Sequence, residues 1–173
     1  MVLAVALVLG VALFAVNGVA EHRELDRLLA RVADTQAEVA YSNHRVAATV
    51  DYTLPLLFRA ALQPRVRAGL QKLVEESAAG QVDGVRQQRD LAARTAVLPW
   101  HHDVRLARAA LVRYLDARVA YLRSVAADQE VLFVEHPDLD RLLAVARQAF
   151  AHAAGPADQH RIDVAFAGGT HPS

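Results

Sequence analysis

The first twenty residues of the chain form an apolar run without a charge. Residues 2–20 read VLAVALVLGVALFAVNGVA, and Asn17 is their only strongly polar side chain. Folded as an α-helix, the run would rise about 28 Å, close to the roughly 30 Å hydrocarbon core of a bilayer. A buried core helix rarely runs so far without a polar stripe. We therefore predict a transmembrane anchor at residues 1–20.

A secretory signal cleaved after Ala20 is the alternative interpretation of this run. Gly18 and Ala20 place small side chains at the two positions that a signal peptidase reads. A signal normally begins with a positively charged region, however, and no Lys or Arg precedes the run. We favour the retained anchor. The arginines that follow it, Arg23, Arg27 and Arg31, give a slight preference for a cytoplasmic C-terminal body, but the side stays open.

Beyond the apolar run, hydrophobic positions recur at three- and four-residue steps, which is typical of one face of a long helix. The stripe consists of Leu25, Leu29, Val32, Gln36, Val39, Asn43, Val46, Val50 and Leu57. Its polar members, Gln36 and Asn43, either form a buried polar layer or lie at the edge of the stripe in water, and we favour the edge. The helix should continue straight out of the apolar run until Pro55, which ends or kinks it.

Prolines and glycines divide the next part of the chain into two more helices. Residues 64–95 keep helical spacing and open on a proline, although Gly80 and Gly84 could break the helix in its middle. A third helix should run from Asp103, a candidate N-cap, to about Ala127. Its predicted apolar face consists of Val104, Ala107, Leu111, Leu115, Val119, Leu122 and Val125.

The last part of the chain predicts a fourth helix and a shorter fifth one. The fourth begins at Pro137 and ends at Gly155 and Pro156, and residues 156–166 form the short helix. Residues 131–134, Val-Leu-Phe-Val, could form a strand, but no partner strand is predicted, so we favour a loop or a helix end. Residues 168–173 should be disordered.

These elements predict an all-α fold, in which an N-terminal transmembrane helix leads into an up-and-down bundle of about four helices. The expected organisation is an anchor at residues 1–20, a helical bundle domain at 21–166 and a disordered tail at 167–173. The chain of 173 residues is long enough for one core beside the anchor, and it contains no internal repeat.

Composition removes several classes of function. The formal net charge is +0, whereas a nucleic-acid-binding protein usually carries a basic excess that neutralises phosphates. Aromatic residues make up 6% of the chain, too few for a base-stacking surface. The absence of cysteine removes disulfides, thiol nucleophiles and Cys-ligated metal sites together. We therefore expect no nucleic-acid partner.

Histidines offer the first candidate chemistry, but their spacing fits no metal site. His101, His102 and Asp103 are adjacent, and neighbouring residues on a helix point about 100° apart, so two of them cannot face one ion there. No histidine pair has the i, i+4 spacing of a helical zinc site. A second group, His152, Asp158, His160 and Asp163, matches no known ligand spacing. We interpret the first group as a solvated turn beside Trp100, which packs on the end of the bundle, and the second as a polar face.

Catalytic patterns are missing as well. Ser42, Ser77 and Ser124 fall within predicted helices, and none lies in a turn that would expose a nucleophile. The carboxylates Glu75 and Glu76 suit a solvated helix face, and Asp138 and Asp140 suit a helix N-terminus. The third helix carries Arg105, Arg108, Arg113, Asp116, Arg118 and Arg123, which could contact anionic lipid or an acidic partner. Because they are spread around the helix, we interpret them as a solvated surface.

The order of the elements resembles that of the LemA family, membrane-anchored helical bundles with one N-terminal span. Residues 51–55 (Asp-Tyr-Thr-Leu-Pro) and 136–139 (His-Pro-Asp-Leu) echo the proline-bearing stretches of that family. The paired arginines and the tryptophan expected before the first proline are missing, so the resemblance is one of architecture. The helical sensory domains of chemoreceptors are a second analogy, but they end in another membrane span.

The sequence thus predicts a single-pass, membrane-anchored helical bundle that acts as a non-enzymatic scaffold or protein-interaction module. Its expected partners are the lipid bilayer and either another protein or a second copy of the chain. No residue is assigned a catalytic, cofactor-binding or metal-binding role. The alternative is an extracytoplasmic ligand-binding or sensory bundle, with a ligand held between helices near Gln36, Asn43 and the arginine-rich third helix. A metal-dependent enzyme ranks third.

Overall fold

The computed structural model describes the backbone of residues 2–59, 64–128 and 137–167, and the side chains of residues 14–57, 64–128 and 138–167. Within these ranges the chain forms five α-helices and one short 3-10 helix, with no strand. The predicted all-α class is therefore confirmed. The residues predicted as a loop or helix end, 131–134, and as a disordered tail, 168–173, lie outside the described ranges.

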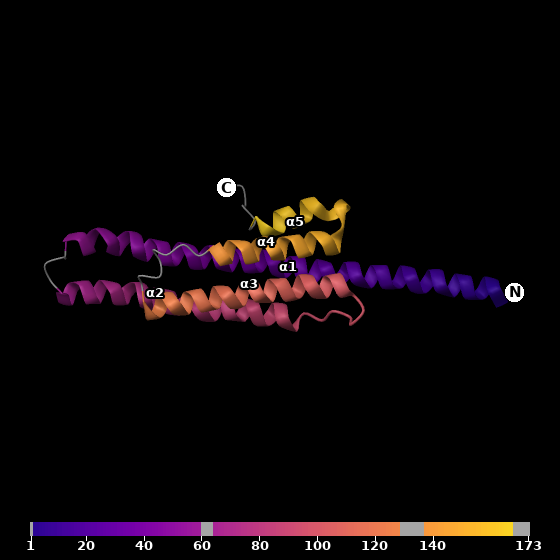
Figure 1. Cartoon of the computed structure of the whole chain (residues 1–173), viewed down its shortest axis with the longest axis horizontal. Helices are drawn as coiled ribbons and strands as arrows, with labels where there is room; N and C mark the ends of the chain where they lie inside the picture. The colour runs from indigo at the N-terminus through magenta and orange to yellow at the C-terminus, as the bar shows by residue number, and fades with distance from the viewer. Residues whose placement is uncertain (1, 60–63, 129–136, 168–173) are drawn as a thin grey trace.

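Helix α1 spans Val2–Arg59 without interruption. Its first turns extend beyond the ends of the other helices (Figure 1). The helix does not end at Pro55 but continues for one more turn, because a proline near the C-terminus of a helix removes only one backbone hydrogen bond. The long helix predicted to continue out of the apolar run is confirmed.

Helix α1 buries two neighbouring stripes, of which the sequence pattern predicted one. The predicted stripe is buried from Leu25 through Val46, except at Asn43, and Gln36 is buried as well. The edge position expected for both polar residues is therefore confirmed for Asn43 and wrong for Gln36. The second buried stripe consists of Leu28, Thr35, Ser42 and Thr53. Thr49, two turns after Ser42 on the same face, donates a hydrogen bond to Ser77 of α2 at 3.1 Å, so this part of the stripe faces α2.

Helix α2 spans Pro64–Arg94, with Pro64 in the first turn as predicted, and it runs unbroken through Gly80 and Gly84. Helix α3 spans His102–Ala127. The prediction that Asp103 is the N-cap of this helix is wrong. Asp103 lies in the first turn, where a carboxylate is favoured by the helix dipole. All seven residues of the predicted apolar face of α3 are buried, from Val104 to Val125.

Helix α4 spans Pro137–Ala154 and is followed by the 3-10 helix η3, Pro156–Asp158, and by α5, Gln159–Phe166. Gly155 has φ 72°, a left-handed conformation that glycine adopts without strain, and its N–H donates to the Ala151 carbonyl at 3.1 Å. The predicted glycine stop and the short last helix are therefore confirmed.

The four long helices run alternately up and down, and α5 folds back along α4 (Figure 1). Helix α2 packs between α1 and α3, α4 packs on α3, and α5 lies against both α1 and α4. The core is built mainly from leucine, valine and alanine, with Phe150 as its largest fully buried side chain. The rings of Phe150 and Phe166 meet edge to face at 5.5 Å, which attaches α5 to α4.

The predicted anchor at residues 1–20 includes residues 2–13, whose side chains lie outside the described ranges. In the part of the chain that the structure does describe, no helix has the length and apolar character needed to cross a bilayer.

Candidate functional site

Four residues from two distant parts of the chain form a hydrogen-bonded group at one end of the bundle, which we call the junction cluster. Asn17 and Glu24 come from α1, two turns apart on the helix, and Trp100 and His101 come from the connection between α2 and α3. Asn17 is the only strongly polar side chain of the apolar run. The cluster therefore joins the apolar run directly to the body of the bundle.

The hydrogen bonds of the junction cluster fix the orientation of Asn17. The indole Nε1 of Trp100, which can only donate, lies 2.8 Å from Asn17 Oδ1. The same oxygen lies 3.1 Å from His101 Nε2. Since an amide oxygen can only accept, His101 must carry a proton on Nε2.

The other ring nitrogen of His101 faces Glu24. His101 Nδ1 lies 2.6 Å from Glu24 Oε2, and the backbone N–H of Leu98 donates to Glu24 Oε1 at 3.1 Å. His101 is 2% exposed and Glu24 is 7% exposed, so both groups depend on each other for hydrogen bonding. One proton lies between them, which makes the pair either an imidazolium with a carboxylate or a neutral imidazole with a carboxylic acid.

Arginines of α3 complete the α2–α3 connection. Arg105 donates from Nη1 to the Pro99 carbonyl at 2.7 Å, and Arg108 donates from Nη1 to the Thr95 carbonyl at 2.8 Å. These bonds satisfy backbone oxygens that lie beyond the end of α2 and have no helical partner. The connection is thus held from both sides, by Glu24 of α1 and by the two arginines.

Exposed apolar side chains lie at the level of the junction cluster along α1. Trp100 is 65% exposed although its N–H is bonded, and Phe14 of α1 is 82% exposed. Val16 and Val19 are exposed as well, and they line a shallow pocket with Ala15, Ala20 and Arg23. The described part of the predicted anchor therefore exposes apolar side chains, and Arg23 follows one turn after Val19.

A cavity of about 260 Å³ between α1 and α3 is the second candidate site. Its lining is mainly apolar, with a few polar groups: Asn43, Val46, Ala47, Val50, Asp51, Arg118, Tyr121, Leu122 and Val125. Arg118 is only 8% exposed, and its Nε has no hydrogen-bond partner among the described residues. Its guanidinium lies 5.2 Å from the centre of the Tyr121 ring.

Burial governs the electrostatics of this cavity. It lowers the pKa of the Arg118 guanidinium from its ordinary value, and the neighbouring Tyr114, Tyr121 and Asp140 oppose that change. Burial also raises the pKa of the Tyr114 phenol. No carboxylate of the described residues lies within ion-pair distance of Arg118. The cation therefore has a planar hydrogen-bonding edge suited to a carboxylate.

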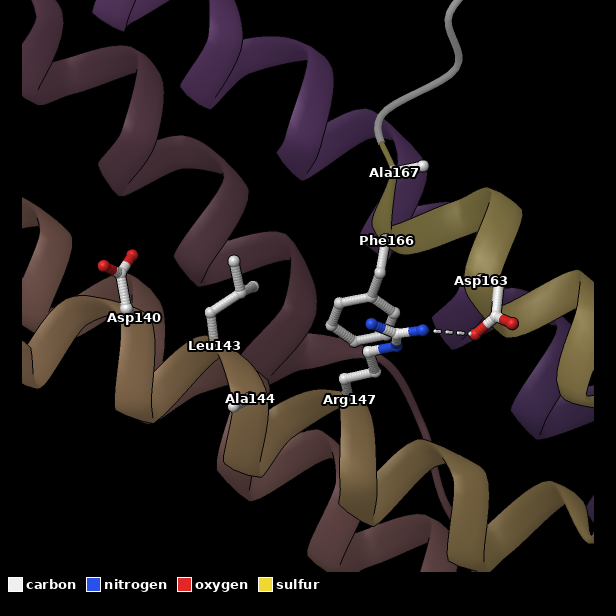
Figure 2. A pocket seen from close by; sticks show the side chains of 7 residues that line it. All are labelled: Asp140, Leu143, Ala144, Arg147, Asp163, Phe166 and Ala167. Carbon is white, nitrogen blue, oxygen red and sulfur yellow. Dashed lines mark hydrogen bonds and ion pairs between the residues drawn. The ribbon is translucent and has the colours of Figure 1, made fainter.

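A third, more open pocket of about 540 Å³ lies between α4 and α5 (Figure 2). Asp140, Leu143, Ala144 and Arg147 line it from α4, and Asp163, Phe166 and Ala167 line it from the end of α5. Arg147 donates to Asp163 at 2.8 Å across the pocket, and this bond lowers the pKa of the Asp163 carboxyl. Because the only cation in the lining is already paired, this pocket offers less to an anionic ligand than the α1–α3 cavity does.

No protein-family model, curated protein or solved structure matches the chain.

The structure separates the candidate metal ligands. His101 is buried in the junction cluster rather than solvated, whereas His102 is exposed. His152 lies 3.7 Å from Asp103, and Asp158 lies 3.9 Å from His22. Among the described residues, no three His, Asp or Glu side chains are placed to share a metal ion.

The candidate catalytic side chains are likewise dispersed. Ser42 is fully buried, Ser77 bonds Thr49, and Ser124 donates to the Ala120 carbonyl of its own helix. Glu76 pairs with Lys72 at 3.6 Å, and Asp138 pairs with Arg141 at 3.0 Å, both on exposed helix faces. The solvated helix face expected for Glu76 is confirmed, and Asp138 lies in the first turn of α4, at the helix N-terminus expected for it.

Asn17 and Glu24 of the junction cluster were not predicted from the sequence, and Arg118 entered only as one of the third-helix arginines near which the alternative placed a ligand. Glu24 and Arg118 carry charges on helices rich in exposed charges, and nothing local distinguishes them from their neighbours. The solvated surface expected for the arginines of α3 is therefore wrong for Arg118. Asn17 did carry a signal, since it is the only polar side chain in a 19-residue apolar run.

Proposed function

We propose that this protein is a single-pass, membrane-anchored helical interaction module. Residues 2–20 form the anchor, and the bundle binds another protein, or a second copy of the chain, at the membrane surface. The observation that carries the proposal is that the apolar run is continuous with the bundle. The run and the first bundle segment form one unbroken helix, α1, and Asn17 within the run is bonded to Trp100 and His101. A bundle attached in this way keeps a fixed distance and orientation to its anchor.

The energetics of the run support insertion. Residues 2–20 contain no charge, and a helix of this length spans the hydrocarbon core with every backbone group hydrogen-bonded. Arg23, Arg27 and Arg31 follow at once, and they favour retention of the C-terminal body on the cytoplasmic side.

Membrane attachment is tested on the full chain expressed in cells. Membranes are washed with alkaline carbonate, and the pellet is compared for the wild type and for Val8→Arg, which places a charge in the middle of the run. Such a charge costs about 2.5–3.5 kcal/mol of insertion free energy. We expect the wild type to stay in the membrane pellet after the wash, and less of the Val8→Arg variant to be retained there. A wild type released by the wash with an intact N-terminus would overturn the anchor.

The interaction role, and the side of the membrane on which the bundle lies, can be tested with one cysteine variant, because the chain contains no cysteine. Arg123 is exposed on α3, so Arg123→Cys reports through labelling by a membrane-impermeant maleimide on which side the bundle lies. Cross-linking of the same variant in mild detergent measures self-association. A body that stays monomeric and is cross-linked to no defined partner in intact membranes would contradict an interaction module.

Ligand binding is a second candidate function, favoured by the α1–α3 cavity. The Nε of Arg118, which is unpaired among the described residues, and the surrounding valine and leucine side chains suit a small ligand with one carboxylate and an apolar body. Octanoate should raise the thermal unfolding temperature of the wild type but not of Arg118→Met, and 1-octanol should not distinguish the two. Equal effects of octanoate on both proteins would remove this candidate.

A further inference from the structure

Trp100 presents an apolar ring to the outside at the level where the predicted anchor ends. Its indole N–H is bonded to Asn17 Oδ1 at 2.8 Å, so the polar part of the side chain points inward, while 65% of the residue stays exposed. The ring also meets the His101 imidazole edge to face, with centroids 6.1 Å apart. A bonded N–H and a packed edge hold this exposed ring in one position.

The height of the ring along α1 is set by its partner. Asn17 lies three residues before the end of the apolar run at Ala20, which is about 4.5 Å along the helix axis. Phe14 is exposed one turn closer to the N-terminus, and Val16 and Val19, which point about 100° and 160° away from Asn17 around the helix, are exposed as well. Trp100 therefore extends the apolar surface of the run sideways, onto the end of the bundle.

Basic groups adjoin this surface on the side away from the N-terminus. Arg23 lines the same shallow pocket as Val16 and Val19, and the exposed Arg105 holds the Pro99 carbonyl next to Trp100. The nearest acidic groups of α1 are Glu21, which is half-buried, and Glu24, which is turned inward to His101. An exposed tryptophan bonded to the last turns of an apolar run, with Arg105 bonded to the residue before it, matches the interface between acyl chains and headgroups.

We infer that the α2–α3 connection is a lipid-contacting surface, with the indole of Trp100 at the headgroup level of the bilayer. The inference rests on the proposed anchor and adds a second point of contact between the bundle and the membrane. A helix that crosses a bilayer alone can tilt, whereas a ring held beside it at the interface fixes the tilt of the bundle.

Trp100 is the only tryptophan of the chain, so its fluorescence reports its surroundings directly. The full chain is reconstituted into vesicles of phosphatidylcholine and phosphatidylglycerol whose acyl chains are brominated either near the headgroup or near the methyl end. Co-flotation with the vesicles tests the anchor, and quenching of the indole tests the inference. We expect quenching in both vesicles, stronger with bromine near the headgroup.

Two matched variants calibrate the measurement in a Trp100→Phe background. Phe14→Trp places an indole inside the apolar run, where quenching should be strong. Tyr41→Trp places one at an exposed aromatic position of α1, 55% against 65% for Trp100, that lies 24 residues beyond Asn17 or about 36 Å away, where quenching should be absent. If the wild-type chain floats with the vesicles but Trp100 is quenched no more than the indole at position 41, the inference is wrong and the anchor stands. A chain that does not float overturns both.

Discussion

His101 Nδ1 lies 2.6 Å from Glu24 Oε2, so a buried imidazole and a buried carboxylate that are 77 residues apart in the sequence share one proton. The second oxygen of Glu24 accepts the Leu98 N–H, and the second nitrogen of His101 is bonded to Asn17. Every hydrogen-bonding group at the centre of the junction cluster is thereby satisfied through a residue on the other segment. The pair closes the end of the bundle that faces the predicted anchor.

Removing the carboxylate should be far more damaging than neutralising it. Glu24→Ala leaves the Leu98 N–H and His101 Nδ1 without their partner, and the loss of one member of a buried pair costs about 3–5 kcal/mol. In Glu24→Gln, the amide oxygen can accept from Leu98 and the amide nitrogen can donate to a neutral His101, so we expect a loss within about 1.5 kcal/mol. Urea unfolding of the full chain in mild detergent, followed by circular dichroism, measures both. Equal losses would contradict this hydrogen-bonding scheme.

Asn17→Leu makes the apolar run more hydrophobic and should still destabilise the bundle. The substitution removes the acceptor of both Trp100 Nε1 and His101 Nε2, and a buried donor left unpaired costs about 1–3 kcal/mol. Asn43→Leu is the matched control, because Asn43 is an exposed asparagine of the same helix, and we expect a change within about 0.5 kcal/mol. The same urea titration compares the two variants. A stabilised Asn17→Leu protein would show that the junction cluster contributes nothing to folding.

Tyr114 should make the stability of the bundle fall in alkaline solution. Burial raises the pKa of its phenol above the ordinary value of 10.0, so the folded state keeps the proton to a higher pH than the unfolded state does. The stabilisation is fully present below pH 10 and is lost as the pH rises through the higher pKa of the folded protein. Unfolding free energies between pH 9 and 11 measure this slope. In Tyr114→Phe the unfolding free energy should fall less steeply with pH. An unchanged slope would mean that other groups cause the effect.

The helices of this fold follow from local pattern, but the polar contacts between them do not. Val104, Leu111 and Leu122 recur at helical spacing on a mainly apolar face, and the hydrophobic effect favours burying that face against the other helices. Gly155 ends α4 because a left-handed residue is required there. Such features depend on residues within a few positions of one another.

Glu24, His101 and Arg118 show what local pattern cannot predict. Each is a charged or titratable residue that a sequence places in water, and each is buried because of partners far along the chain or, for Arg118, because a mainly apolar cavity surrounds it. Thr35 and Ser42 were also not predicted, since their small polar side chains do not mark a buried position in the sequence, yet both are fully buried. The candidate sites depend on such residues, so they became visible only in the fold.

The glycines of α2 give a test of how closely α1 approaches that helix. Alanine is favoured over glycine inside a helix by about 1 kcal/mol. A methyl group at Gly80 or Gly69 would meet no other atom within 4 Å, so Gly80→Ala and Gly69→Ala should each stabilise the protein by about that amount. A methyl group at Gly84 would fall on the carboxylate of Glu38, which would have to rotate away, so Gly84→Ala should gain less or destabilise. The measurement is the unfolding free energy of each of the three variants, compared with the wild type in the same detergent. An equal gain at Gly84 would mean that Glu38 does not rest on α2, and that the two helices lie further apart there than the structure places them.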